Sequence, residues 1–289
     1  MKQRIIPTLA FTLFLTISLL SGYQNTAAAS ASETTALTME QAVRANTAAN
    51  LLKHYQSVTY AQLDYIGGNT MHLTYFKDKQ GNPSTTEDDF GYTGYRTDSF
   101  AFSRENGKST YELCAMKNKG VSEYLFMVQG SEFTSQTTDK NGNLVCVTQA
   151  DINQDYADQL STIWKATTKD KMVTTTVFAA DDFRVLSIEF SLRRPDGAEL
   201  PIASGVMLYD QKIQHSDAVQ GYLNAKKVNV SICMEDGTTR MAEIPKGKTY
   251  TWNCDEGYAL YLDKDGKTPL SRKPGPVQSN LKLYCLPVK

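Results

Sequence analysis

Side chains that could carry out acid–base or nucleophilic chemistry are few and widely spaced in this 289-residue sequence. The three histidines, His54, His72 and His215, are too far apart for two of them to share one helical face, as metal-binding pairs do. Ser279 and Lys282 have the Ser-x-x-Lys spacing, but the catalytic pair requires a helix and this segment predicts the start of a strand. The GxSxG, HExxH and GxxxxGK(S/T) motifs are absent. We therefore expect no enzymatic activity, no cofactor and no metal ion.

Three acidic segments fall short of a cation site. Residues 139–142 and 263–266, with the sequences DKNG and DKDG, are similar to the beginning of a calcium-binding loop. Each lacks the third early oxygen ligand and the glutamate at the twelfth position that such loops use. Glu87, Asp88 and Asp89 are consecutive, so neighbouring carboxylates of an extended chain point in different directions. The first two segments predict hairpin turns, and the third predicts a solvated loop.

The five cysteines, at positions 114, 146, 233, 254 and 285, are an odd number at wide spacing. Such a pattern does not describe a dense disulfide framework, and the absence of a CxxC pair gives no support to zinc binding or dithiol redox chemistry. Cys285 alternates in phase with Leu281 and Leu283, which predicts an inward-facing strand residue. We expect mostly buried thiols with at most one or two disulfides, whose pairing the sequence leaves open.

The N-terminal segment 1–29 has the organisation of a secretory signal peptide. Lys2 and Arg4 precede an apolar run at 5–20, and small residues at 27–31 provide a cleavage zone. The run is shorter than the roughly 20 residues that a stable transmembrane helix needs. The sequence therefore predicts a secreted or cell-envelope-associated protein with no transmembrane segment after signal cleavage.

Composition excludes one large class of partner. The formal net charge is −1, and removal of the positive charges of Lys2 and Arg4 makes it −3. No basic stripe is present, so we expect no nucleic-acid partner. With 41% hydrophobic residues the chain can form a substantial core, and its 16 tyrosines suit a strand-rich fold or a wet recognition surface.

The segment VLSIEFSLR, residues 185–193, has the clearest secondary-structure pattern. Leu186, Ile188, Phe190 and Leu192 alternate with polar residues, which predicts a strand with one buried and one solvated face. One-sided burial favours an antiparallel sheet. The four apolar side chains either pack solidly against covering helices or line a pocket, since the period is the same in both cases. We name these four as the candidate ligand-binding residues.

Composition and periodicity divide the chain into five segments: a signal peptide at 1–29, a disordered segment at 30–37, a domain at 38–210, a linker at 211–225 and a small β module at 226–289. In the first domain, apolar spacing predicts helices at about 38–55 and 151–166, and Asn106-Gly107 predicts a tight hairpin turn. The predicted fold class is α+β: an antiparallel curved sheet covered by two helices, followed by a small all-β or β-grasp-like module.

The order of elements in 38–210, the predicted export and the run VLSIEFSLRRPDG resemble the half-barrel of bacterial lipoprotein-carrier and related lipid-binding envelope proteins. In that family a curved sheet wraps covering helices around an apolar cavity. The resemblance implies carriage or sensing of an acyl chain or another apolar ligand. The function expected on this basis is that of a secreted, envelope-associated binding protein that holds a lipid between sheet and helices.

Four short motifs follow one another in the C-terminal segment: DGT at 236–238, PKGKTYTW at 245–252, GYALYLDKDGKTPL from Gly257 and NLKLYCLPV from Asn280. Together they resemble the internalin B-type repeat, a β-grasp-like module of bacterial surface proteins. The sequence departs from that family in having Ala259-Leu260-Tyr261 where Gly-Trp followed by Tyr is usual. The resemblance implies surface display or adhesion without chemistry. The alternative function is therefore an interaction module for an envelope protein or glycan, with a solid core and no small ligand.

Overall fold

A computed structural model describes residues 36–64, 68, 70–79, 81–89, 91–116, 132–272 and 274–288 of the chain. The fold is mostly β, with 50% strand and 14% helical residues, and four helices are present in the described part. The predicted α+β class is therefore wrong. The predicted signal peptide at 1–29 and most of the segment at 30–37 lie outside the described residues.

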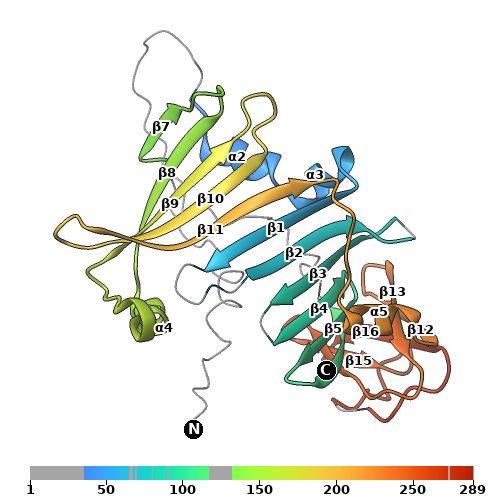
Figure 1. The fold of residues 1–289 in the computed structure, drawn as a ribbon. Coiled ribbons are helices and arrows are strands. Elements are labelled where there is room, and N and C mark those ends of the chain that lie inside the picture. Colours follow the sequence, from blue (N-terminus) through green and yellow to red (C-terminus); the bar gives the residue numbers. More distant parts are fainter. Residues whose placement is uncertain are drawn as a thin grey trace. The chain divides into compact units, whose positions relative to one another are not determined.

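Four helices and sixteen strands make up the described chain (Figure 1). The helices are α2 (Met39–Ala45), α3 (Ala48–His54), α4 (Gln154–Trp164) and α5 (Asp217–Asn224). The strands are β1 (Ser57–Asp64), β2 (Thr70–Lys77), β3 (Pro83–Asp89), β4 (Tyr92–Thr97), β5 (Phe100–Glu105), β6 (Lys108–Ala115), β7 (Ser135–Thr138), β8 (Leu144–Asp151), β9 (Lys171–Phe178), β10 (Val185–Arg193), β11 (Glu199–Tyr209), β12 (Lys227–Cys233), β13 (Thr239–Pro245), β14 (Thr251–Cys254), β15 (Tyr258–Tyr261) and β16 (Leu281–Pro287).

The strands form two sheets rather than one curved sheet under two helices. The larger sheet has 12 strands in the order β14-β6-β5-β4-β3-β2-β1-β11-β10-β9-β8-β7, and the smaller has four in the order β13-β12-β16-β15. The larger sheet is mixed, because β14 pairs with β6 in parallel while its other described strand pairs are antiparallel. The apolar face that two helices were expected to cover is thus part of a much larger β structure.

Contacts group the described residues into two compact units that are discontinuous in sequence. The first unit takes residues from the ranges 1–51, 61–70 and 124–208, and the second takes residues from 52–60, 71–123 and 209–289. Helix α5 occupies much of the predicted linker at 211–225. The boundaries inferred from the sequence stay a prediction about how the chain divides.

The first unit contains an antiparallel series of strands from β7 to β11 (Figure 1). Strand β9, with the sequence KMVTTTVF, is rich in the β-branched residues that favour strands. The prediction that residues 185–193 form an antiparallel strand is confirmed, since β10 pairs antiparallel with both β9 and β11. These strands position the candidate site.

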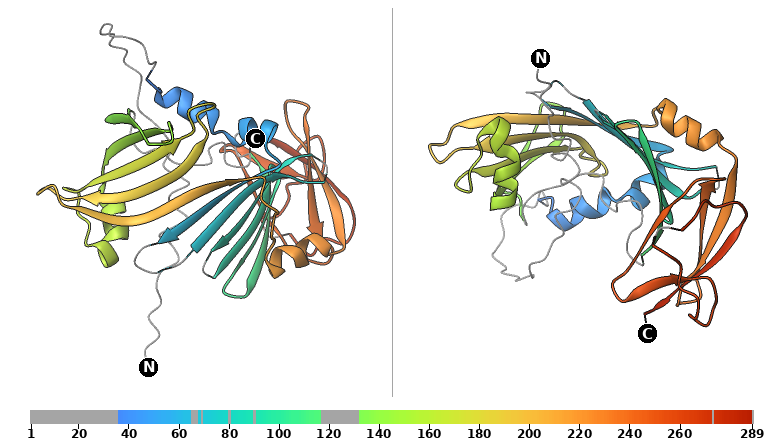
Figure 2. Two further views of the ribbon diagram at one scale, coloured as in Figure 1. Left: turned by 45° about the horizontal axis from the view of Figure 1, so that its top comes forward. Right: turned by 90° about the horizontal axis from the view of Figure 1, so that it is seen from below.

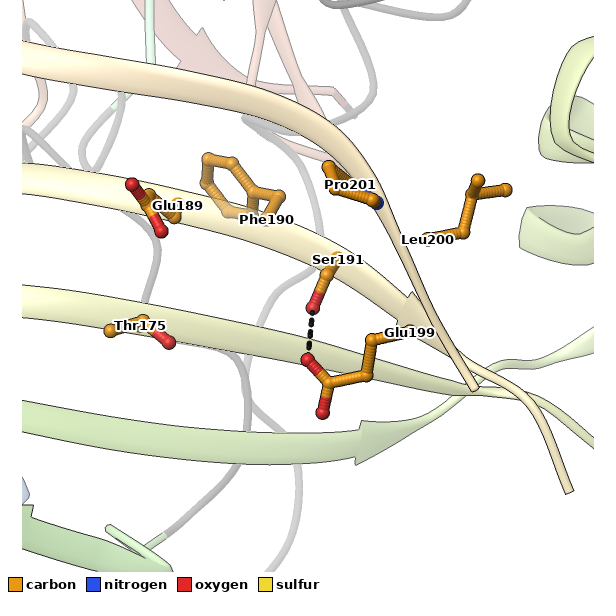
Figure 3. A pocket seen from close by; sticks show the side chains of 7 residues that line it. All are labelled: Thr175, Glu189, Phe190, Ser191, Glu199, Leu200 and Pro201. Carbon is orange, nitrogen blue, oxygen red and sulfur yellow. Dashed lines mark hydrogen bonds between the residues drawn. The ribbon is translucent and has the colours of Figure 1, made fainter. Parts of the chain in front are cut away.

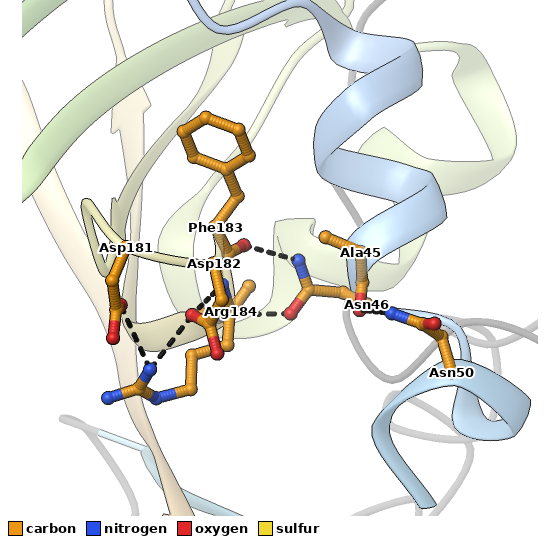
Figure 4. A network of polar contacts seen from close by, with 8 residues as sticks. Ala45, Asn46, Asn50, Asp181, Asp182, Phe183 and Arg184 are labelled. Carbon is orange, nitrogen blue, oxygen red and sulfur yellow. Dashed lines mark hydrogen bonds and ion pairs between the residues drawn. The ribbon is translucent and has the colours of Figure 1, made fainter. Parts of the chain in front are cut away.

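The predicted helix at 38–55 is interrupted at Asn46, where α2 ends before α3 begins (Figure 4). The spacing of Thr38 and Gln41 predicts a capping box, and this box is present at the start of α2. The Asn46 side chain, which is fully buried, donates to Ala42 O at 2.8 Å and so competes with the helical hydrogen-bond pattern. Local side-chain bonding therefore divides a segment whose apolar spacing is continuous.

Helix α4 is shorter than the predicted helix at 151–166. Its N-cap is Asn153, whose side chain accepts a hydrogen bond from the backbone of Tyr156 at 2.8 Å. Helical spacing predicts one apolar stripe that includes Leu160 and Ile163. Leu160 and Trp164 are buried, whereas Ile163 has an exposed fraction of 38%. The apolar stripe of α4 is therefore displaced by one residue at its C-terminal end.

The second unit has one hydrophobic core made by strands from distant parts of the sequence. Leu113 of β6, Val230 of β12 and Leu283 of β16 belong to the same buried cluster, and each is fully buried. Strand β14 pairs in parallel with β6, so the segment at 226–289 contributes a strand to the larger sheet. The same segment, orange to red in Figure 2, also forms the smaller sheet. In the structure the buried residues of this segment share a hydrophobic cluster with residues from the range 76–115.

Tyr222 of helix α5 stacks with two aromatic rings of β5. The ring centroids of Phe100 and Phe102 each lie 5.2 Å from that of Tyr222, with interplanar angles of 15° and 9°. The Tyr222 hydroxyl donates to Glu243 O at 3.0 Å, which satisfies its polar end. Burial is the main cause of a raised Tyr222 pKa, so the phenol stays neutral.

The hairpin predicted at Asn106-Gly107 is confirmed. Strands β5 and β6 pair antiparallel up to Glu105 and Lys108, which leaves a two-residue turn. Both turn residues have positive φ angles, 48° at Asn106 and 79° at Gly107, as such tight turns require.

Candidate functional site

Strand register places three of the four predicted ligand-binding residues on one buried face. Ile188, Phe190 and Leu192 have exposed fractions of 1%, 5% and 0%. Leu186 differs from them, because the pairing with β9 shifts between Val185 and Ser187 and leaves it as the extra residue of a β-bulge. Leu186 is only partly buried, and Val185 takes the buried position at this end of the strand.

The same face continues across β9 and β8. Phe190 is the register partner of Thr174, which in turn is the partner of Thr148. In the next row, Ile188 is paired with Thr176 and Thr176 with Cys146. Directly paired residues of antiparallel strands project to the same side of a sheet. We call this surface the inner face, and its buried side chains are those of Cys146, Thr148, Met172, Thr174, Thr176, Phe178, Val185, Ile188, Phe190 and Leu192.

Three hydroxyls of the inner face lack hydrogen-bond partners. Thr148, Thr174 and Thr176 have exposed fractions of 1%, 0% and 1%, and their Oγ1 atoms contact no donor or acceptor among the residues that the structure describes. Paired hydroxyls elsewhere behave differently: Ser103 and Thr110, also register partners, are hydrogen-bonded at 2.6 Å. A buried hydroxyl without a partner costs about 1–3 kcal/mol, so three on one face require an explanation.

The polar groups of the inner face are electrically neutral. Burial raises the pKa of the Cys146 thiol to about 11, so it remains protonated at physiological pH. Threonine hydroxyls do not ionise, and the remaining inner-face side chains are apolar. This face can therefore donate and accept hydrogen bonds within an apolar surround, but it offers no charge to a ligand.

The opposite side of the same strands carries a groove of about 620 Å³ (Figure 3). Glu189 and Ser191 of β10 alternate with the inner-face residues and line this groove together with Glu199 of β11. We call it the outer groove, and its lining residues are Thr175, Glu189, Phe190, Ser191, Glu199, Leu200 and Pro201. Phe190 is thus the predicted ligand-binding residue that also contributes to this groove.

An ion pair fixes one end of the outer groove. Arg193 Nε donates to Glu199 Oε1 at 2.8 Å, and the Ser191 hydroxyl donates to Glu199 Oε2 at 3.4 Å. Arg193 also donates to the Gln149 side chain at 3.3 Å. The Glu189 side chain is exposed and points to the solvent side of the strand, so it gives the groove a negative charge that Arg193 does not neutralise.

The segments at 139–142 and 263–266 form turns, and Lys282 lies in a strand. Asp139 accepts hydrogen bonds from the backbone of Asn141 and Asn143, and backbone N–H groups led by that of Lys267 lower the pKa of Asp263 to about 2. Both carboxylates thus close the turns predicted for them. Lys282 lies on a strand, β16, as expected.

The acidic run at 87–89 is an exception to these predictions. It belongs to strand β3 and not to a solvated loop, and burial raises the pKa of Glu87.

Across the described ranges, no group of three or more histidine, cysteine or acidic side chains is arranged to hold a metal ion. In the same ranges, no helix is long and apolar enough to span a membrane.

Sequence reasoning missed the threonines of the inner face. The apolar alternation of β10 pointed to Ile188, Phe190 and Leu192, but Thr148, Thr174 and Thr176 read as ordinary strand formers. The signal was nevertheless present in β9, where Thr174 and Thr176 alternate in phase with Met172 and Phe178. Threonines at alternate residues of a strand, in phase with apolar residues, indicate hydroxyl groups on a buried face.

No protein-family model matches the chain, and no curated protein matches it either. The resemblances to the lipoprotein-carrier half-barrel and to the internalin B-type repeat therefore stay predictions.

Proposed function

We propose that the chain is a binding protein whose inner face holds a mostly apolar ligand with one or two neutral hydrogen-bonding groups. The observation that carries the proposal is the set of three buried hydroxyls, on Thr148, Thr174 and Thr176, without partners among the described residues. They lie in register with Ile188 and Phe190. Binding sites for small apolar ligands commonly combine such a surround with a few polar groups that fix orientation.

The electrostatics of the inner face select the class of ligand. Burying a free carboxylate against this face would leave a charge with no cationic partner among the inner-face side chains, at a cost that hydroxyls alone do not offset. An ester, an amide or an alcohol carries no such charge and can use hydroxyl donors and acceptors. We therefore expect a neutral acyl compound, such as a fatty ester or fatty alcohol, to bind more tightly than a fatty acid of the same chain length.

The test compares two threonines that are neighbours in β9 but face opposite ways. Thr174→Val removes an unpaired inner-face hydroxyl with little change of shape, whereas Thr175→Val changes the outer groove. Titration with a fluorescently labelled fatty alcohol should show binding to the wild type, weakened about three- to tenfold in Thr174→Val and unchanged in Thr175→Val. Native mass spectrometry of protein purified from its own host should show a bound lipid-sized mass.

The same variants distinguish a ligand site from a solid core. In the ligand-free state, Thr174→Val should raise the free energy of unfolding by about 1–3 kcal/mol, because it removes an unsatisfied buried hydroxyl. Higher stability combined with weaker uptake supports the proposal. Higher stability of Thr174→Val with unchanged uptake of the fatty alcohol would show that the inner face is only core packing, and would refute the proposal. A ligand-free mass of the host protein together with no fatty-alcohol uptake by the wild type would refute it as well.

Export belongs to the same proposal and rests on the composition of residues 1–31. Cleavage near Ala29 or Ala31 would release the protein to the envelope or the medium. N-terminal sequencing of the protein secreted by its host should begin within a few residues of these alanines. A start at Met1 would contradict export through a cleaved leader.

The outer groove supports a second candidate, an interaction module for an envelope protein or a glycan. Its mixture of carboxylates, hydroxyls and the exposed Leu200 and Pro201 suits a polar partner with apolar patches. Glu189→Gln and Thr175→Val should weaken capture of such a partner while leaving fatty-alcohol uptake unchanged. Loss of fatty-alcohol uptake in these variants would instead show that the ligand and the partner bind at one site.

A further inference from the structure

We propose that Cys254 and Cys285 form a disulfide that joins the two sheets of the second unit. Their Sγ atoms lie 3.9 Å apart, with the Cys285 thiol directed at Cys254. Cys254 is the last residue of β14, in the larger sheet, and Cys285 lies on β16, in the smaller sheet. A disulfide requires the sulfurs to approach by a further 2 Å or so.

Strand register holds the two thiols together independently of their own contact. Cys254 is paired with Ala115 in the parallel β14–β6 ladder. The Cys285 thiol also lies 3.6 Å from the carbonyl oxygen of Ala115. Both cysteines therefore converge on one residue of β6, and their proximity follows from the backbone of three strands.

The other cysteines are placed differently. Cys114 precedes Ala115 in β6, so its side chain projects to the opposite side of the sheet from that of Ala115. Cys146 is buried on the inner face of the first unit. Cys233, at the end of β12, is contacted at 4.0 Å by the Thr239 hydroxyl. The described structure thus selects one pair out of the five cysteines, which the sequence could not do.

The bond would form by thiol–disulfide exchange with a small-molecule disulfide oxidant. The Cys254 thiolate attacks one sulfur of the oxidant, breaks its S–S bond and releases one thiol. The Cys285 thiolate then attacks the mixed disulfide at Cys254 and releases the second thiol. Two protein thiols are oxidised, one oxidant disulfide is reduced, and the thiol protons pass to solvent and to the released thiolates.

Accessibility and acidity determine the rate of this exchange. Cys254 is only half-buried, so it is the sulfur that an oxidant can reach, while Cys285 is fully buried. The hydrogen bond with Cys285 and burial raise the pKa of Cys254. Because the thiolate is the attacking species, exchange should be slow at neutral pH and faster at alkaline pH.

Oxidation of the full-length protein by oxidised glutathione tests the assignment. Non-reducing peptide mapping of the wild type should show Cys254 linked to Cys285, with Cys114, Cys146 and Cys233 alkylated. The bond closes a loop between residues 31 positions apart, so the thermal midpoint should rise by on the order of 10 °C over that of the reduced protein.

Two variants complete the experiment. Cys233→Ser is the matched control, since it removes a half-buried thiol outside the pair and should keep both the cross-link and the rise in midpoint. Cys254→Ser should lose both. If Cys254→Ser does not fold, the wild-type peptide map decides: alkylation of both Cys254 and Cys285 after exchange, or a cross-link from either to another cysteine, overturns the proposal.

Discussion

Asn46 connects the end of α2 to the turn between β9 and β10 through a single side-chain amide (Figure 4). Its Nδ2 donates to Phe183 O at 2.8 Å, and its Oδ1 accepts from the backbone of Val185 at 2.8 Å. Phe183 has a φ angle of 59°, a left-handed conformation that costs free energy in a bulky residue. The buried amide thus holds a strained turn beside the first residue of β10.

Substitution of Asn46 should be costly for its size. Asn46→Ala removes three hydrogen bonds of a fully buried side chain, so the free energy of unfolding should fall by about 2–4 kcal/mol. Asn50→Ala is the control, because that side chain makes one bond, to Ala45 O, in a partly buried position. Urea denaturation measures the free energy of unfolding of both variants. Equal losses would show that the buried hydrogen bonds of Asn46 stabilise the fold no more than the single bond of Asn50.

We expect the partly buried imidazole of His215 to make the stability of the fold depend on pH. Burial lowers the pKa of His215 below its ordinary value of 6.5, and its Nδ1 has no hydrogen-bond partner in the described structure. The unfolded chain therefore binds a proton more readily than the folded chain does, so the free energy of unfolding should fall as the pH decreases below about 6.5. In His215→Leu this contribution should be absent. Parallel stability curves for the wild type and the variant between pH 7.5 and 5 would contradict the prediction.

At the scale of residues, the sequence predicts apolar positions better than polar ones. The two-residue period of β10 is sufficient to identify Ile188, Phe190 and Leu192 as buried. It places Leu186 on the same face, because periodicity cannot reveal the bulge at this residue. Whether a threonine hydroxyl finds a partner depends on the neighbouring strand, which is set by register and not by local sequence.

At the scale of elements, two glycines offer opposite tests of backbone conformation. Gly107 has a φ angle of 79° in the β5–β6 turn, so Gly107→Ala should lower the free energy of unfolding by about 1 kcal/mol. Gly221 lies within α5, and an added Cβ would meet no atom within 4 Å. Gly221→Ala should therefore raise stability by up to about 1 kcal/mol. Thermal unfolding of both variants checks the pair, and effects of the same sign would contradict these conformational assignments.

Elements were predictable where local chemistry determined them. The β5–β6 hairpin and the capping box of α2 follow from residues that are adjacent in sequence. Strand β3, with the sequence PSTTEDD, was missed because it has almost no apolar alternation and is specified by its pairing with β2 and β4. Ser84, Thr85 and Thr86 of this strand are buried although they are polar, which the local sequence does not predict.

At the scale of the whole molecule, the second unit joins early and late parts of the chain in one core. Leu283→Ala should therefore destabilise strands far from it in sequence, with a loss of about 2–5 kcal/mol from the cavity left behind. Hydrogen exchange should accelerate at the backbone amides of β5 and β6 as much as in β16 itself. Faster exchange confined to residues 226–289 would show that the C-terminal segment folds as an independent module.

The long-range pairing explains why the fold class could not be derived from the sequence. The motifs of the C-terminal segment describe its short strands well, but no local feature indicates that β14 leaves the smaller sheet and pairs with β6. A parallel pair between distant strands is selected by the complementarity of two apolar surfaces. Such complementarity is visible only after the strands have been placed.

The parallel ladder of β6 and β14 also affects how early in synthesis the core of the second unit can form. Glu112 is synthesised long before its register partner Thr251, so β4, β5 and β6 emerge with apolar side chains that have no surface to cover them. Distant pairings make folding slow and leave such surfaces open to aggregation. In the nascent chain these side chains therefore stay uncovered until strands β12 to β16 have been synthesised.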